Sequence, residues 1–155
     1  MTTEVERRFL VPTDVEVSAS SSERQLMQGY LAVDGSVSVR LRRSDDTWVL
    51  CVKGGHGLIR TEVERDVSDA EADAMWPLTE GRRISKVRRR IGLAGGLTAE
   101  LDEFGDELAG LRIVEVEFDS AHDAERFEPP SWFGTEVTDD SRWSNSNLAQ
   151  FGLPT

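Results

Sequence analysis

The sequence predicts a mainly β (α+β) fold, an eight-stranded antiparallel closed β-barrel with a few flanking helices. Eight short segments alternate apolar and polar residues with the period of two that is typical of strands. Turn-forming pairs such as Asp34-Gly35 and Gly54-Gly55 separate them, and helix signals are few. Mostly sequential strands with few helices favour an antiparallel sheet that curls into a barrel.

The expected strands are spread along the whole chain. The first is the acidic opening segment "TEVERRFLV", residues 3–11, and the others are expected at residues 26–33, 36–43, 47–54, 58–67, 83–91, 97–104 and 111–118. The small polar segment "VSASSSERQ", residues 17–25, is expected to form a surface loop between the first two strands. The strands therefore suffice for one closed sheet.

Three short helices are expected outside the sheet, at residues 68–77, 120–127 and about 144–151. Ser68 is a typical N-cap for the first helix, and Pro77 would end it. Ser120 or Asp119 would cap the second helix. We expect a single domain that spans residues 1–155, because a chain of this length can bury a real core.

Composition excludes several classes of protein. The net charge is −11, from 29 acidic and 18 basic residues, which argues against a nucleic-acid binder and against binding to an anionic membrane surface. Cys51 is the only cysteine, so we expect neither an intramolecular disulfide nor a cysteine-based metal site. No apolar run approaches the ~18 residues of a membrane span, and Glu4 and Glu6 stand where a signal peptide needs basic and apolar residues. The cytoplasm is the expected compartment.

Charged side chains share one face of nearly every expected strand. Alternation places eight acids on these faces: Glu4, Glu6, Glu62, Glu64, Glu100, Asp102, Glu115 and Glu117. It places eight bases there as well: Arg8, Arg40, Arg42, Lys53, Arg60, Lys86, Arg88 and Arg90. A half-solvated sheet would explain any single strand. It does not explain why the sign of the charge is sorted by strand, so we expect these faces to line the barrel interior, with the apolar faces packed outward under the helices.

Such an interior would hold a particular kind of guest. Its charges balance when it is empty, so a highly anionic guest could bind only together with cations. Arginine and lysine suit phosphate oxygens, and clustered carboxylates suit hard divalent ions such as Mg²⁺ or Mn²⁺. A chain of phosphates with one or two such ions satisfies both halves.

These motifs resemble the CYTH superfamily, the triphosphate tunnel metalloenzymes. "EVERR" is similar to the Glu-x-Glu-x-Lys signature of that family, and the resemblance continues through "QGYL", "VRLR", "VKGG…RTEVE", "EGRRISKVR", "ELDEF", "LRIVEVEF" and "WFGTEVTDDSRWSN". It covers nearly the whole chain in order and is nearest to the short bacterial members. The resemblance implies an eight-stranded antiparallel barrel whose tunnel binds triphosphate groups.

The resemblance also implies roles for residues. The metal ligands would be Glu4, Glu6, Asp102, Glu115 and Glu117, while Glu62 and Glu64 would hold a second metal ion or the attacking water. Arg8, Lys86 and Tyr30 would join Glu62 and Glu64 in catalysis, although Tyr30 could equally be a core aromatic. Substrate phosphates would be bound by Arg8, Arg40, Arg42, Lys53, Arg60, Lys86 and Arg88.

Two positions depart from the family pattern. Arg8 stands where the signature has lysine, which keeps the charge but replaces a compact ammonium by a rigid fork of donors. Ser144 stands where the late motif usually has lysine, in a helix that closes one end of the tunnel. His56 and His122 are expected at the surface, and Trp132, Phe133 and Trp143 are expected to be packing residues.

The expected activity is metal-dependent hydrolysis of inorganic tripolyphosphate to pyrophosphate and phosphate, with Mg²⁺ or Mn²⁺, two ions in all, as cofactor. Hydrolysis of thiamine triphosphate or of a nucleotide is the first alternative, and a class IV adenylate cyclase ranks lower because no adenine pocket or ribose base is evident. A third possibility, from another class, is a non-catalytic protein that binds triphosphate or short polyphosphate. The partner is thus a small-molecule triphosphate, and the protein would be a monomer or a homodimer.

Overall fold

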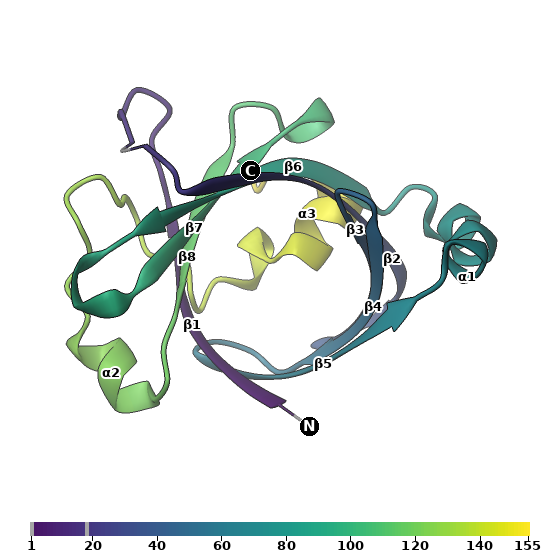
Figure 1. Ribbon diagram of the computed structural model, residues 1–155, viewed down its shortest axis with the longest axis horizontal. Helices are drawn as coiled ribbons and strands as arrows, with labels where there is room; N and C mark the ends of the chain where they lie inside the picture. The colour runs from purple at the N-terminus through teal and green to yellow at the C-terminus, as the bar shows by residue number, and fades with distance from the viewer. Residues whose placement is uncertain (1, 18) are drawn as a thin grey trace.

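A computed structural model, which describes residues 2–17 and 19–155, shows an eight-stranded barrel (Figure 1). The strands are β1 (Thr2–Leu10), β2 (Ser22–Asp34), β3 (Val37–Ser44), β4 (Thr47–Gly54), β5 (Ile59–Val67), β6 (Arg83–Gly92), β7 (Thr98–Phe104) and β8 (Arg112–Glu117). Every neighbouring pair is antiparallel, and the order β1-β5-β4-β3-β2-β6-β7-β8 closes on itself. The predicted fold class is confirmed.

Short helices join and cover the strands. They are α1 (Asp69–Met75), α2 (Ala121–Arg126) and α3 (Asn145–Phe151), with 3₁₀ turns η1 (Trp76–Thr79), η2 (Ala94–Gly96), η3 (Asp106–Leu108) and η4 (Ser141–Trp143). Ser68 caps α1 through a reciprocal pair of hydrogen bonds with Glu71, as its sequence position predicts. Ser120 caps α2, as predicted, because its hydroxyl accepts a hydrogen bond from the backbone N–H of Asp123. Among the described residues, no helix is long and apolar enough to cross a membrane.

One stretch of the sequence was assigned wrongly. Residues 22–25, expected in a loop, extend β2 and pair with β6, with Ser22 opposite Arg90 and Arg24 opposite Arg88. These four residues are polar, and none is a β-branched or aromatic residue of the kind enriched in strands. The hydrogen bonds that β6 offers to an adjacent edge override this preference, so β2 is longer than the alternation of its apolar residues indicates.

The larger apolar cluster lies outside the barrel wall, on one side, and a second cluster lies under the C-terminal segment. Phe9, Leu101, Val114 and Val116 point outward from β1, β7 and β8, where Ala124 of α2 and Phe133 pack against them. Trp132 and Phe133 are partly buried against this cluster, as predicted for packing residues.

The outer face of β3, β4 and β5 differs from the expectation that helices would cover it. There Val37, Val52, Ile59 and Val63 are 42–51% exposed. The helices are too short and too few to reach this face, and α1 packs beyond its edge (Figure 1).

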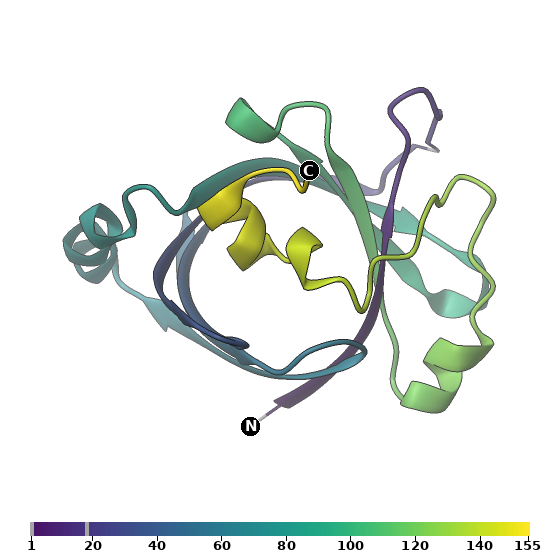
Figure 2. The ribbon, with the colours of Figure 1, turned by 180° about the vertical axis from the view of Figure 1, so that it is seen from behind.

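The C-terminal segment crosses one end of the barrel. Figure 2 shows η4 and α3, in yellow, lying across the ring of strands. We call residues 141–151 the plug. Leu148 anchors it, buried against Ile84, Phe104 and Ile113. Ser144 is the N-cap of α3, because its hydroxyl accepts a hydrogen bond from the backbone N–H of Asn147 at 3.2 Å.

Candidate active site in the barrel interior

The charged faces of the strands do line the interior, and three acids meet there. Ligand oxygens of Glu4, Glu6 and Glu117 lie within 4.8 Å of one another, since β1 places Glu6 directly opposite Glu117 of β8. Burial, followed by Glu115 among its charged neighbours, raises the pKa of Glu6 to about 8. Burial and then Glu4 raise the pKa of Glu117 to about 7. The cluster therefore carries more negative charge than its surroundings stabilise, which is the environment that a hard divalent cation fits.

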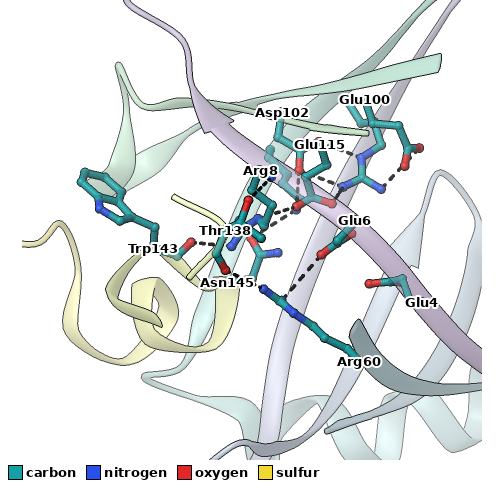
Figure 3. A network of polar contacts seen from close by, with 12 residues as sticks. Glu4, Glu6, Arg8, Arg60, Glu100, Asp102, Glu115, Thr138, Trp143 and Asn145 are labelled. Atoms are coloured by element: carbon teal, nitrogen blue, oxygen red, sulfur yellow. Dashed lines mark hydrogen bonds and ion pairs between the residues drawn. The ribbon is translucent and has the colours of Figure 1, made fainter. Parts of the chain in front are cut away.

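Two cations from β4 and β5 border this acidic cluster. The ammonium of Lys53 lies 2.9 Å from Glu4, 3.4 Å from Glu62 and 3.9 Å from Glu6. Burial alone would lower the pKa of Lys53, but Glu6 and Glu4 raise it above its usual range. Arg60 reaches Glu6 at 3.6 Å (Figure 3). Lys53 therefore stays charged beside the acids.

Arginine donors without partners point to an anionic guest. Arg40 is only 6% exposed, and among the described residues its Nε atom has no hydrogen-bond partner. The buried Nη2 atom of Arg8 and the buried Nε atom of Arg42 likewise have no hydrogen-bond partner among these residues. Burial disfavours the charge of Arg40, but Tyr30 and Cys51 outweigh burial and raise its pKa. A buried, charged donor without a partner is costly unless an acceptor is supplied, and phosphate oxygens are suitable acceptors.

Asp102 already forms ion pairs with two cationic side chains. Arg88 donates to both of its oxygens, at 2.7 and 2.8 Å, and the ammonium of Lys86 lies 2.7 Å away. Burial lowers the pKa of Lys86 to about 8, and the attraction of Asp102 only partly opposes this. A metal ion bound by Asp102 would have to displace these partners. In this structure Asp102 instead fixes the positions of the Lys86 and Arg88 side chains.

Glu115 is likewise held by arginines. The Nε atom of Arg8 donates to it at 3.0 Å, and Arg88 lies 4.0 Å away (Figure 3). Burial alone would raise the pKa of Glu115, but Arg8 and Arg88 lower it well below its usual range. Glu115 thus lies beside the cluster of Glu4, Glu6 and Glu117 rather than within it.

A second group of potential ligands lies on β4 and β5. Ligand atoms of Cys51, Glu62 and Glu64 lie within 4.8 Å of one another. This group differs from the expectation that no metal site involves a cysteine, because the pairing of β4 with β5 places the Cys51 sulfur beside the two carboxylates. Burial raises the pKa of the Cys51 thiol, and Glu64 is paired with Arg42 at 3.3 Å. This group is therefore less available to a metal ion than the cluster on β1 and β8.

The interior opens toward both ends. At the plug end lies a cavity of about 180 Å³. Its wall includes Tyr30, Arg40 and Lys53, and its cover includes Ser144 and Asn145 of the plug. Tyr30 is 2% exposed and lines this cavity, so the structure supports its position on the tunnel face. At the other end a wider hollow of about 890 Å³ is bordered by Glu4, Glu62, Glu100 and Glu117.

The predicted site residues thus converge in one interior, and sequence reasoning missed three others. Arg24 lines a separate, smaller hollow of about 130 Å³ together with Arg42, Arg88 and Arg90, and sequence reasoning missed it because residues 22–25 were expected in a loop. Gln28 is 1% exposed, opposite Arg42, and alternation along β2 could have found it. His56, expected at the surface, is exposed but also lines the cavity beneath the plug.

Comparisons with known proteins give relatives along nearly the whole chain, although no protein-family model matches the sequence. An inorganic triphosphatase of Nitrosomonas europaea is 43% identical over 150 residues, which are 95% of this chain and 97% of that protein. An inorganic triphosphatase of Acetivibrio thermocellus is 37% identical over 149 residues, 95% of this chain and 93% of that one.

Solved structures share the fold. The crystal structure of the inorganic triphosphatase NE1496 matches with a TM-score of 0.74 and 38% identity over 99% of both chains. A conserved hypothetical protein from Pyrococcus furiosus matches with a TM-score of 0.60 over 79% of this chain and 82% of that one. At 19% identity the second likeness concerns the fold alone.

Proposed function

Because the chain belongs to the CYTH superfamily of triphosphate tunnel enzymes, as a short bacterial member akin to inorganic triphosphatases, we propose that it hydrolyses inorganic tripolyphosphate to pyrophosphate and phosphate. The observation that carries the proposal is the sorted charge of the interior. Buried arginine donors that have no partner among residues 2–17 and 19–155 face the same tunnel as a crowded cluster of three carboxylates. A triphosphate with a divalent ion supplies what each set lacks.

The residues present fit such an ion. Glu4, Glu6 and Glu117 would hold it, since their oxygens already converge and the raised pKa values of Glu6 and Glu117 show uncompensated charge. When bound, Mg²⁺ or Mn²⁺ would neutralise charge on the phosphate oxygens during phosphoryl transfer. A second ion at Glu62 and Glu64 is part of the proposal, and the pairing of Glu64 with Arg42 makes that position the weaker of the two.

The side chains of the chain itself bind and orient the substrate. Arg40, Arg42 and Arg88 would donate to phosphate oxygens along the tunnel, and Lys53 and Arg60 would do so beside the acids. Positioning and charge stabilisation account for most of the catalysis in phosphoryl transfer. Glu62 and Glu64 are our candidates for accepting a proton from the attacking water, while the bond to the leaving pyrophosphate breaks in line with the attack.

Phosphate release by the purified protein tests the proposal. With Mg²⁺ or Mn²⁺ and tripolyphosphate, we expect one phosphate and one pyrophosphate per substrate consumed. Parallel assays with thiamine triphosphate and ATP rank the alternative substrates. Tight binding of tripolyphosphate without release would instead support the non-catalytic binder. A cytoplasmic location and a monomeric or homodimeric state stay predictions of the sequence.

A further inference from the structure

The plug is held across the tunnel end by side chains of the barrel wall. Arg8 donates from Nη1 to the backbone oxygen of Trp143 at 2.9 Å, and Lys86 donates from Nζ to the side-chain oxygen of Asn145 at 3.3 Å (Figure 3). The plug residues that line the cavity are all uncharged: Ser141, Ser144, Asn145, Ser146 and Asn147. The cationic contacts between wall and plug therefore come from the wall.

Most donors of the Arg8 guanidinium form hydrogen bonds within the protein. Its side chain is 3% exposed, and its Nε atom donates to Glu115 at 3.0 Å while Nη1 reaches Trp143. Only Nη2 is buried without a partner among the described residues. Its backbone is tied to the chain just before the plug as well, because its N–H donates to Thr138 and its carbonyl accepts from Val137.

This arrangement depends on the shape of arginine. A guanidinium presents its donors on separate edges of one rigid plane, so it can hold a carboxylate and a carbonyl that lie in different directions. A lysine ammonium is a single point on a flexible stem and would not fix both groups at the same distances. Arg8 cannot bind phosphate through two nitrogens in this arrangement, since Glu115 and Trp143 already occupy two of its three nitrogens.

We propose that Arg8 is a positioning residue that couples the plug to Glu115 on β8 and so fixes the cover of the substrate cavity. The inference rests on the proposed triphosphatase function and deepens it. Arg8 offers the substrate one N–H edge, and its main contribution is to hold Trp143, and with it Ser144 and Asn145, over the cavity. The absence of a lysine at position 144 fits this role, because Ser144 serves as the helix cap and the wall supplies the charge.

Hydrogen exchange in Arg8→Lys tests the proposal directly. The variant keeps the charge beside Glu115 and loses the contact with Trp143. We expect amide exchange within residues 141–151 to accelerate by at least about tenfold, while exchange in the barrel strands is unchanged. Arg60→Lys is the matched control, since Arg60 also lies beside the acids. It contacts Gly57, Glu6 and the backbone oxygen of Thr138, and among the described residues it has no hydrogen bond or ion pair with residues 141–151. Plug exchange in this control should equal that of the wild type.

Kinetics supply the second readout. In Arg8→Lys we expect KM for tripolyphosphate to rise at least about threefold with a smaller change in kcat. The reason is that the substitution loosens the cover of the cavity, which affects substrate binding more than the chemical step. Unchanged exchange in the plug would overturn the proposal, and so would faster exchange throughout the strands, which indicates a general structural role. A loosened plug with unchanged KM would overturn the link to the substrate. If the wild type released no phosphate, the proposed function would fail while the exchange result still decided the role of Arg8.

Discussion

The surroundings of Glu6 give the strongest indication that the barrel interior binds a cation. It is 2% exposed, and its pKa lies near 8 because burial and two neighbouring carboxylates disfavour its charge. A protein does not keep such a group charged without a compensating cation. Sequence alternation placed Glu6 on the tunnel face, but its burial and the approach of Glu117 came only from closure of the barrel.

Replacing Glu6 by Gln should therefore impair use of the metal. We expect kcat/KM to fall at least about 10- to 100-fold at limiting Mg²⁺, with partial recovery at high Mg²⁺. Steady-state phosphate release across a Mg²⁺ titration measures this. Glu16→Gln, on an exposed loop, is the control and should behave as wild type. Equal activity of Glu6→Gln and the wild type at limiting Mg²⁺ would remove Glu6 from the metal site.

Arg40 should contribute to affinity for the triphosphate. Its Nε atom is buried and has no hydrogen-bond partner in the part of the chain that the structure describes, so Arg40→Ala would remove a donor that a bound triphosphate would satisfy. We expect binding to weaken by about 1.5–3 kcal/mol, the range for charge-assisted hydrogen bonds. Calorimetry with a divalent ion that does not support turnover isolates this step. Arg43→Ala, a neighbour on the opposite face of β3 that pairs with Asp46, is the control, and an equal loss in both variants would contradict the assignment.

At the scale of strands and helices, the sequence predicted what depends on local periodicity. The alternation along β3 assigned Arg40 and Arg42 to one face correctly, and Ser68 marked the start of α1. The first residues of β2 were missed because their strand state depends on pairing with β6, which lies some 60 positions away in the chain. Long-range pairing of this kind leaves no mark in a local pattern.

Arg24, in that missed part of β2, should help to draw the substrate into the tunnel. It is exposed and lines a small hollow together with Arg42, Arg88 and Arg90, so we expect it to attract the substrate by long-range electrostatics rather than through a fixed contact. For Arg24→Gln we expect kcat/KM to fall by roughly two- to fivefold at low ionic strength, and the difference to vanish in high salt. Arg65→Gln, an exposed arginine on β5, is the control. A loss that persists in high salt would mean that Arg24 binds phosphate directly.

At the scale of the whole molecule, the barrel separates its charges by strand. Acids come mainly from the neighbouring strands β1, β7 and β8, and bases come mainly from β3 and β6, of which β6 adjoins the acidic strand β7. The sorting could be predicted from sequence, because it follows from alternation. The pairings that decide which groups are free could not, since Asp102 and Arg88, or Glu115 and Arg8, meet only across neighbouring strands.

The acidic wall should make the metal-free protein less stable as the pH rises toward 8. Glu6 and Glu117 have pKa values raised from 4.5 to about 8 and about 7 in the folded protein. Between pH 4.5 and these values the folded state binds more protons than the unfolded state, so the free energy of unfolding decreases with pH. The slope for each group is at most about 1.4 kcal/mol per pH unit. Lys86, with its pKa lowered to about 8, acts in the opposite sense only above that pH.

Thermal unfolding in a chelator, measured from pH 5 to pH 8, tests this expectation. We expect the midpoint temperature to fall across the range, and Mg²⁺ to restore it most at the high end, because an ion that binds only the folded state stabilises it. Glu6→Gln removes one of the two titrating groups, so its midpoint in chelator should depend less on pH and exceed that of the wild type at pH 8. If wild type and variant showed the same pH dependence, the proton on Glu6 would not be linked to folding, and the crowding of carboxylates that supports the metal site would be wrong.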